Sequence, residues 1–156
     1  MEDQMRSKKE NKKTRENSRE LIVYKVVREI CHRYYSAVIR PKMGGLTYEI
    51  GETTKPDIPE APIMAFAEVH RASDFVMWNS GVGMDGYPRI LECRAVEFER
   101  PLKKCILYPQ EIGSAIDMHY FWKKRLWEFS KGMRESFREV PNGTVFCSEV
   151  TPIRLV

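Results

Sequence analysis

The stretch that most constrains the fold runs from Pro62 to Phe98, because strand, helix and turn patterns follow one another within it. Residues 63–67 (IMAFA) are apolar on both alternating faces, which is typical of a buried strand. From Glu68 onward, apolar side chains at three- and four-residue spacing predict an amphipathic helix. Residues 88–98 (PRILECRAVEF) predict a second strand. The two strands are either parallel neighbours with a right-handed crossover or are joined in antiparallel fashion through a third strand.

Length and composition indicate one globular domain. The chain has 156 residues, which suffices for one core and not for two. Its net charge of +4 is too mild to identify a nucleic-acid binder. No apolar run approaches the ~18 residues of a membrane span, and the N-terminus lacks the apolar core of a secretory signal. The cysteines lie in apolar runs without a CxxC pair, as reduced core thiols do: Cys31, Cys93, Cys105 and Cys147. We therefore expect a cytoplasmic protein without a membrane partner.

Residues 1–18 are almost free of apolar side chains, so they cannot bury enough surface to offset the entropy of ordering. We expect a disordered basic arm that precedes a single domain of residues 19–156. The arm is either a solubilising tail or a contact for nucleic acid or another acidic partner. Its candidate contact residues are Lys8, Lys9, Lys12 and Lys13.

Further strands are expected on both sides of the central stretch. Residues 21–29 (LIVYKVVRE) predict the first strand, residues 31–40 the second and residues 46–50 the third, with a hairpin bend between the first two. Residues 51–62 form a long proline-stiffened loop, which suits a lid or rim beside a cleft. Residues 102–108 predict a short strand.

The C-terminal third predicts a second helix and a closing strand. Residues 115–131 form the helix, which Gly132 ends, and residues 133–139 are expected to continue in a helical turn. Residues 141–143 (PNG) are a strong turn signal. Residues 144–156 then form a strand, in which Pro152 requires a sheet edge or a bulge. The predicted fold class is α+β: a single compact domain with a mixed, mostly antiparallel sheet packed by two main helices.

The sequence matches to cofactor and metal motifs lack the neighbouring elements or the spacing that such sites require. Residues 81–86 match GxGxxG, but they follow a helix and lead into a strand, the reverse of a dinucleotide site. His32, His70 and His119 have no partner at metal-ligand spacing, so a zinc site with Cys93 and Cys147 would need tertiary coincidence. We expect no cofactor and no metal.

Basic residues 123–125 interleave with aromatic residues on the second predicted helix. Aromatic rings beside cations can stack bases and neutralise phosphates, so Lys123, Lys124 and Arg125 are candidate contacts for nucleic acid or another partner. A core helix with a basic polar side gives the same pattern. Both interpretations stay open.

The chain also carries a family-like pattern. The segments VYKVVR, YYSAVI, LTYEIGETTKP, PIMAFAEVHRASDFV, RILECRAVEF and VPNGTVFCSEVTPIRLV together resemble a group of small uncharacterised phage and other viral proteins. The resemblance covers roughly residues 23–98 and the last sixteen or so residues. It implies a compact α+β domain of viral or mobile-element origin, hence a life in the host cytoplasm, and it transfers no activity.

A remoter resemblance is to folds of the ADP-ribosyltransferase type. Those folds place an arginine or histidine on the first strand, a serine or tyrosine on a later one, and a glutamate near the end. Arg28, Ser36 or Tyr48, and Glu92 occur in that order. The Ser-Thr-Ser run and the paired glutamates of that family are missing. The resemblance implies that these four residues could bind a nucleotide-like ligand without catalysing a reaction of it.

We expect an accessory protein of phage or viral type that binds a host macromolecule or a nucleotide-like ligand without catalysis. One alternative is a cryptic NAD-dependent transferase built on Arg28, Tyr48 and Glu92. The other alternative is a nucleic-acid-binding module that uses the basic arm and residues 123–125. Catalytic residues are not identified by the sequence.

Overall fold

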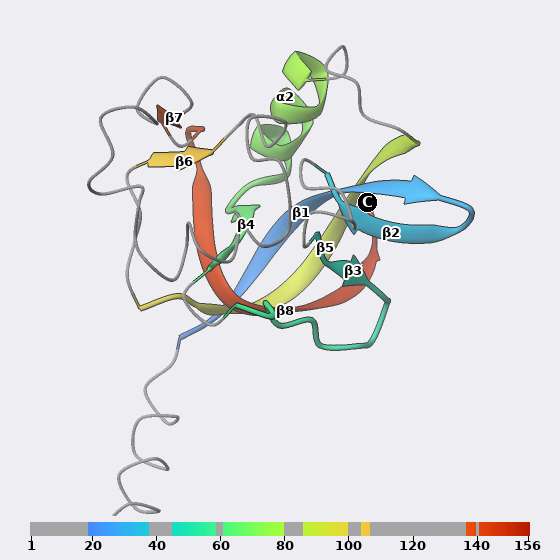
Figure 1. Ribbon diagram of the computed structural model, residues 1–156, viewed down its shortest axis with the longest axis horizontal. Coiled ribbons are helices and arrows are strands. Elements are labelled where there is room, and N and C mark those ends of the chain that lie inside the picture. The colour runs from blue at the N-terminus through green and yellow to red at the C-terminus, as the bar shows by residue number, and fades with distance from the viewer. Residues whose placement is uncertain are drawn as a thin grey trace, which may run out of the picture.

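The computed structural model describes residues 19–37, 45–58, 61–79, 86–99, 104–106, 137–139 and 141–156. These residues form a six-stranded sheet, a two-stranded sheet and one helix (Figure 1). The larger sheet contains β1 (Glu20–Ile30), β2 (Arg33–Ser36), β3 (Thr47–Tyr48), β4 (Ile63–Phe66), β5 (Tyr87–Glu97) and β8 (Thr144–Leu155). The helix is α2 (Val69–Asn79), and the smaller sheet pairs β6 (Lys104–Ile106) with β7 (Phe137–Glu139).

The larger sheet closes into a small barrel. Its strand order is β3-β2-β1-β4-β8-β5, and β1 pairs with β5 as well, from Glu20 with Val96 to Glu29 with Tyr87. On its other edge, β1 meets β4 at Tyr24 and then β2 from Val27 onward. A closed sheet has no long open edge, so most backbone groups of these strands find partners within the barrel.

The first part of the 51–62 loop completes the barrel wall. Thr54 and Val150 exchange two backbone hydrogen bonds, of 2.8 and 3.1 Å between nitrogen and oxygen, and the hydroxyl of Thr54 donates to the carbonyl of Thr47. The amide of Gly51 donates to the carbonyl of Pro152. This part of the loop is therefore bonded to β8 and β3 as wall, where the sequence favoured a lid or rim.

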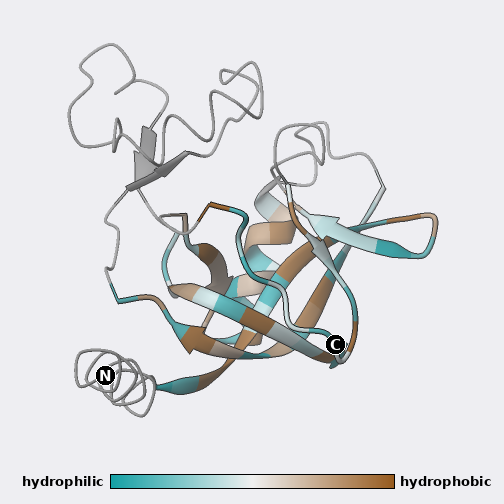
Figure 2. Cartoon of the chain, turned by 60° about the horizontal axis from the view of Figure 1, so that its bottom comes forward, coloured by the Kyte–Doolittle hydropathy of each residue, from teal (hydrophilic) through white to brown (hydrophobic). Residues whose placement is uncertain are grey.

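The core lies inside the barrel, where alternate residues of each strand point inward. On β1 and β5 these are Val23, Val27, Leu91, Cys93 and Ala95, all of them buried. The long strands carry both hydrophobic and hydrophilic residues along their length (Figure 2). Inward-facing and outward-facing residues alternate along a strand, so hydrophobic residues at every second position are expected when only one face of the sheet packs on the core.

Two bulges keep the inward face of β8 apolar. The register with β5 shifts between Val96 and Glu97 and again between Glu92 and Cys93. Val145 and Cys147 face the core before the first shift, and Val150 and Pro152 face it after the shift. Pro152, which has no amide proton to donate, lies next to the second shift. The expectation that Pro152 needs an edge or a bulge is thus confirmed.

Helix α2 covers part of the outer face of the sheet. Its buried residue Ala72 packs with Val26, Ala37 and Phe66 of the sheet side. The rings of Phe66 and Phe75 lie 5.4 Å apart between centroids. The amphipathic spacing from Val69 onward therefore places its apolar stripe where the sequence predicted, against a sheet.

Most of the predicted strands are confirmed, with corrections at their ends. The buried strand of residues 63–67 is β4, although Ala67 itself is exposed. The second strand starts only at Arg33, because Cys31 and His32 form the hairpin turn with φ of 50° and 61°. Cys31 is consequently exposed and is not the core thiol that was expected. Residues 46–50 contribute only β3.

Other predictions concern the arrangement of strands and the second helix. Every pairing between the described strands is antiparallel, so the described sheet is not mixed, and β4 and β5 are joined through a third strand, β8. Residues 137–139 form β7, so the predicted helical turn is wrong at that point. The predicted helix of residues 115–131 and the arm of residues 1–18 lie outside the described residues. In the part of the chain that the structure describes, no helix is long and apolar enough to cross a membrane.

Candidate functional site

The residues proposed from the sequence for ligand binding lie on two sides of the barrel wall. Ser36 is opposite the inward-facing Val27, and Tyr48 belongs to the buried hydrophobic core inside the barrel. Arg28 follows the inward-facing Val27 on β1, so its side chain points to the outer face of the sheet. The side chain of Glu92 points the same way, because its neighbours Leu91 and Cys93 face inward. The structure therefore brings Ser36 and Tyr48 together, and it places Arg28 and Glu92 outside.

Ser36 and Tyr48 are held by hydrogen bonds between β2 and the start of β3. The Ser36 hydroxyl accepts a hydrogen bond from the amide of Leu46 at 3.0 Å, and the Ser36 amide donates to the carbonyl of Leu46 at 2.9 Å. Burial raises the pKa of the Tyr48 phenol, and a hydrogen bond with the Ser36 side chain opposes that rise. Tyr48 therefore stays protonated at neutral pH and presents a neutral hydroxyl inside the barrel.

A charged residue that the sequence reading missed lies beside them. Lys25 shares the inward direction of Val23 and Val27, and its Nζ atom lies 5.6 Å from the ring centroid of Tyr48. The ammonium donates a 2.8 Å hydrogen bond to the carbonyl of Met64. The signal was present in residues 21–27 (LIVYKVV), because Lys25 is the one charge in the alternating row with Leu21, Val23 and Val27.

The environment of Lys25 disfavours its charge. Burial lowers the pKa of the Lys25 ammonium to about 8, whereas the thiols of Cys93 and Cys147 act weakly in the opposite direction. Burial in turn raises the pKa of Cys93 to about 12 and that of Cys147 to about 11, while Lys25 opposes both shifts. We call Lys25, Ser36, Tyr48, Cys93 and Cys147 the interior cluster. Its thiols are protonated and unreactive at neutral pH, and its amine is the group open to chemistry or binding.

Arg28 has a structural partner on the other side of β1. Its side chain is only 2% exposed, and its Nε atom donates a 3.0 Å hydrogen bond to the carbonyl of Ser36. This bond crosses from β1 to the end of β2. Arg28 thus fixes the β1–β2 hairpin beyond its last paired residues.

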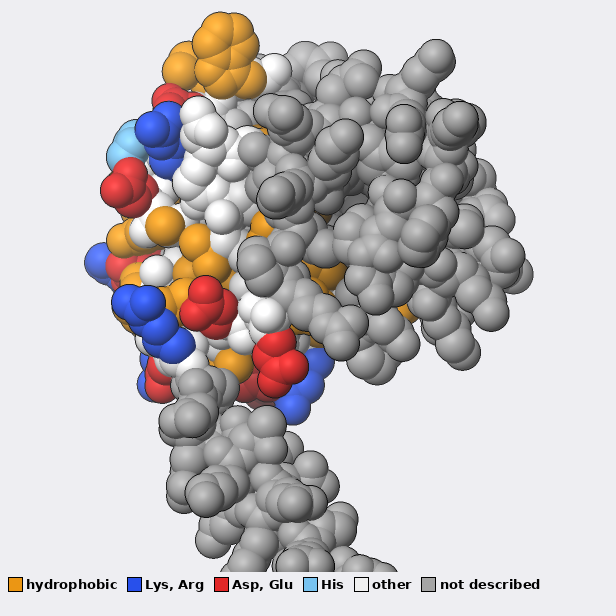
Figure 3. Space-filling model, turned by 90° about the vertical axis from the view of Figure 1, so that its left-hand side faces the viewer, with side chains coloured by type: hydrophobic (Ala, Val, Ile, Leu, Met, Phe, Trp, Pro, Cys, Tyr) orange, Lys and Arg blue, Asp and Glu red, His pale blue; other side chains and the backbone are white. Residues whose placement is uncertain are grey.

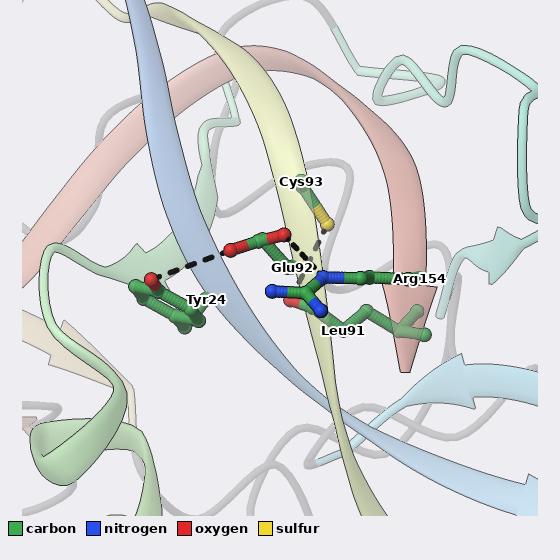
Figure 4. Close-up of polar contacts among 5 residues, drawn as sticks. All are labelled: Tyr24, Leu91, Glu92, Cys93 and Arg154. Carbon is green, nitrogen blue, oxygen red and sulfur yellow. Dashed lines mark hydrogen bonds and ion pairs between the residues drawn. The ribbon is translucent and has the colours of Figure 1, made fainter. Parts of the chain in front are cut away.

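Glu92 belongs to an outward-facing polar row across three strands. Its Oε2 accepts a 2.7 Å hydrogen bond from Nε of Arg154 on β8, and its Oε1 accepts a longer one, 3.5 Å, from the Tyr24 hydroxyl on β1 (Figure 4). The Arg154 hydrogen bond lowers the pKa of Glu92, and burial acts against it. The carboxylate therefore stays ionised and anchors the row.

Two further rows extend this surface along the same strands. Ile22, Arg94 and Thr151 are neighbours in register, and Glu20, Val96 and Glu149 form the next row. We call these six residues, together with Tyr24, Glu92 and Arg154, the outer sheet face. Ile22 is 50% exposed and the Arg154 side chain 68%. An apolar side chain in the middle, flanked by both signs of charge, is a composition suited to contact with another macromolecule.

The remaining candidate contacts cannot be placed. Lys8, Lys9, Lys12, Lys13, Lys123, Lys124 and Arg125 lie outside the described residues. His70 pairs with Glu68, at 3.1 Å between Nε2 and Oε2, in place of the Asp74 pairing that helical spacing allows. Within the described ranges, no group of histidine, cysteine and carboxylate side chains could hold a metal ion.

No protein-family model matches the chain, and comparison with curated proteins and with solved structures found no similar chain.

Proposed function

We propose that the protein is an accessory protein of phage or viral type that acts by binding a host macromolecule, without catalysis of its own. The observation that carries this proposal is the outer sheet face. It offers the hydrophobic Ile22 and the aromatic Tyr24 beside two guanidinium groups, those of Arg94 and Arg154. Aromatic and arginine side chains are enriched at the energetic centres of protein interfaces.

The charges of this face favour a protein over a nucleic acid as the partner. Three carboxylates, Glu20, Glu92 and Glu149, stand among its two arginines. Phosphate groups would meet these carboxylates at close range, and the repulsion would oppose binding. A protein surface can answer both signs of charge with its own side chains.

The geometry gives less support to the transferase alternative. That hypothesis needs Arg28, Tyr48 and Glu92 in one cleft, and Tyr48 points into the barrel while Glu92 points out of it. A nucleotide-like ligand keeps partial support, since Ser36 and Tyr48 do lie together. The nucleic-acid alternative depends on residues 1–18 and 123–125 and stays a prediction.

Charge exchange tests the outer sheet face. In Glu92→Arg and Arg154→Glu the ion pair becomes a like-charge pair, whereas the double variant restores an ion pair with reversed direction. We expect the full-length double variant to keep the melting temperature of the wild type within a few degrees, because exposed pairs contribute about 0–1 kcal/mol. It should lose, at least about tenfold, the affinity for the protein that wild type captures from host extract.

The control variant is Glu29→Arg with Arg89→Glu, a second exchange of a partly exposed ion pair between β1 and β5 that lies outside the outer sheet face, with 2.8 Å between its charged atoms. Cross-linking to the captured protein should map to peptides of β1, β5 and β8. Unchanged capture by the Glu92–Arg154 exchange variant, or cross-links that avoid these strands, would refute the proposal.

A further inference from the structure

Lys25 carries a charge that the described residues do not neutralise. Elsewhere on β1, β5 and β8, described charges do find partners, as Arg154 does with Glu92 and Arg89 with Glu29. Within the described part of the chain, Lys25 has no carboxylate partner, and the ionisable groups that act on it are two protonated thiols. An enclosed ammonium without a counter-charge is costly unless something compensates for it.

The contact with Met64 explains only part of this arrangement. β4 pairs with β1 at a single position, Tyr24 with Phe66, so the carbonyl of Met64 receives the Lys25 ammonium in place of a strand partner. An ammonium has three donors, and this carbonyl takes one of them. A backbone carbonyl is neutral, so the positive charge itself is left for another group.

Lys25 also occupies a break in the barrel wall. The edge of β1 is paired with β4 at Tyr24 and with β2 from Val27, so Lys25 lies at the changeover between the two neighbours. Its side chain is partly exposed, in contrast to Val23 and Val27 on either side. Lys25 therefore lies in the barrel wall as a partly exposed residue, at a point where the edge of β1 passes from one neighbouring strand to the other.

We propose that Lys25, with the hydroxyls of Tyr48 and Ser36 beside it, forms a binding site for a small phosphate-bearing anion at the changeover from β4 to β2. The anion supplies the missing counter-charge, and the ammonium donors that Met64 does not use bond its oxygens. Hydrogen bonds between an ammonium and an anion are stronger than those between neutral groups. This site is distinct from the outer sheet face and does not depend on binding there.

Thermal unfolding of the full chain with inorganic phosphate and with AMP tests the site, at pH 7 and constant ionic strength. We expect a saturable rise in melting temperature of about 3–5 °C at ten times the dissociation constant. Lys25→Met should lose the rise, whereas Lys55→Met, which removes a surface lysine of 63% exposure, should keep it. Saturation by phosphate alone identifies the phosphate group as sufficient, and saturation by AMP alone adds the nucleoside to the ligand.

Acetylation of wild type gives a measurement that needs no variant. Phosphate or AMP should slow modification of Lys25 severalfold, with modification of Lys55 unchanged as read by peptide mass spectrometry. The proposal is wrong if neither anion gives a saturable rise in wild type. It is equally wrong if Lys25→Met responds as wild type does, or if Lys25 and Lys55 are protected alike.

Discussion

The ammonium of Lys25 and the carbonyl of Met64 lie 2.8 Å apart and join β1 to β4 just beyond the one pair of residues that the strands share. A side chain here performs the task that a backbone amide performs elsewhere in the sheet. The arrangement places an ionisable amine inside the barrel wall, and the pH dependence of stability follows from it.

Stability should rise between pH 7 and 9 because of Lys25. Its pKa in the folded protein is about 8, below the ordinary value of 10.5, so the unfolded chain keeps a proton that the folded chain releases. Raising the pH through this window therefore favours folding. The free energy of unfolding of wild type relative to Lys25→Met should increase by about 1 kcal/mol from pH 7 to 9, measured by urea titration. A constant difference would contradict the lowered pKa.

Above pH 9 the buried thiols should act in the opposite direction. The pKa values of Cys93 and Cys147 are raised, to about 12 and about 11, so the unfolded chain loses protons that the folded chain retains. Stability should therefore fall with pH in this range, and Cys93→Ala should reduce the slope. Cys147→Ala provides the matched comparison. Equal slopes in wild type and both variants would show that the thiols are not the cause.

Thiol reactivity should separate Cys31 from these two. Cys31 is exposed in the hairpin turn, whereas Cys93 and Cys147 are fully buried. Their raised pKa values reduce the thiolate fraction at pH 8, so alkylation should be about 100-fold slower or more than at Cys31. Peptide mapping after timed iodoacetamide treatment measures each rate. Adding denaturant should make the three rates similar.

Gly86 should tolerate alanine far less well than Gly51. Both have a left-handed φ, of 86° and 88°, which costs a residue with a Cβ about 1–2 kcal/mol. At Gly86 a Cβ would also lie 2.5 Å from the backbone oxygen of Glu29, whereas at Gly51 it meets open space. We expect Gly86→Ala to lower the free energy of unfolding by about 3 kcal/mol and Gly51→Ala by about 1 kcal/mol. Equal losses in denaturant titrations would contradict the close approach.

Leu91 should be among the most sensitive core positions. It is fully buried inside the barrel, opposite Lys25 on β1. Leu91→Ala should cost about 2–5 kcal/mol, since the closed wall limits relaxation around the cavity. Ile22→Ala, on the outer sheet face, is the control and should cost less than about 1 kcal/mol. Urea titration of both variants gives the comparison.

The contrast between Gly86 and the GxGxxG pattern shows what the sequence could predict. The order of a helix before the glycines and a strand after them was predictable, because that context is local, and α2 and β5 do lie on either side. The close contact of Gly86 with Glu29 is not local, since it depends on the pairing of β5 with β1. Strand positions were predictable from alternation, whereas barrel closure was not, because the partner of each edge is chosen by tertiary packing.

The candidate site was predictable only in part for the same reason. Ser36 and Tyr48 were chosen through a resemblance, and they do lie together, whereas Glu92 of the same set faces outward. Lys25 was overlooked because a lysine in a strand usually faces water, although its alternation with Val23 and Val27 already indicated the inward direction that these two residues have. Arg154, the partner of Glu92, lies 62 residues further along the chain. No spacing pattern in the sequence predicts a contact between two residues so far apart.

The position of β8 between β4 and β5 has a consequence for biosynthesis. β8 follows all the other described strands in chain order, yet both of those earlier strands bond to it. As the polypeptide emerges from the ribosome, each would expose an unpaired edge until residues 144–155 arrive. Nascent chains halted before Thr144 should consequently be recognised by chaperones as unfinished, because the ring cannot close before β8 has been synthesised.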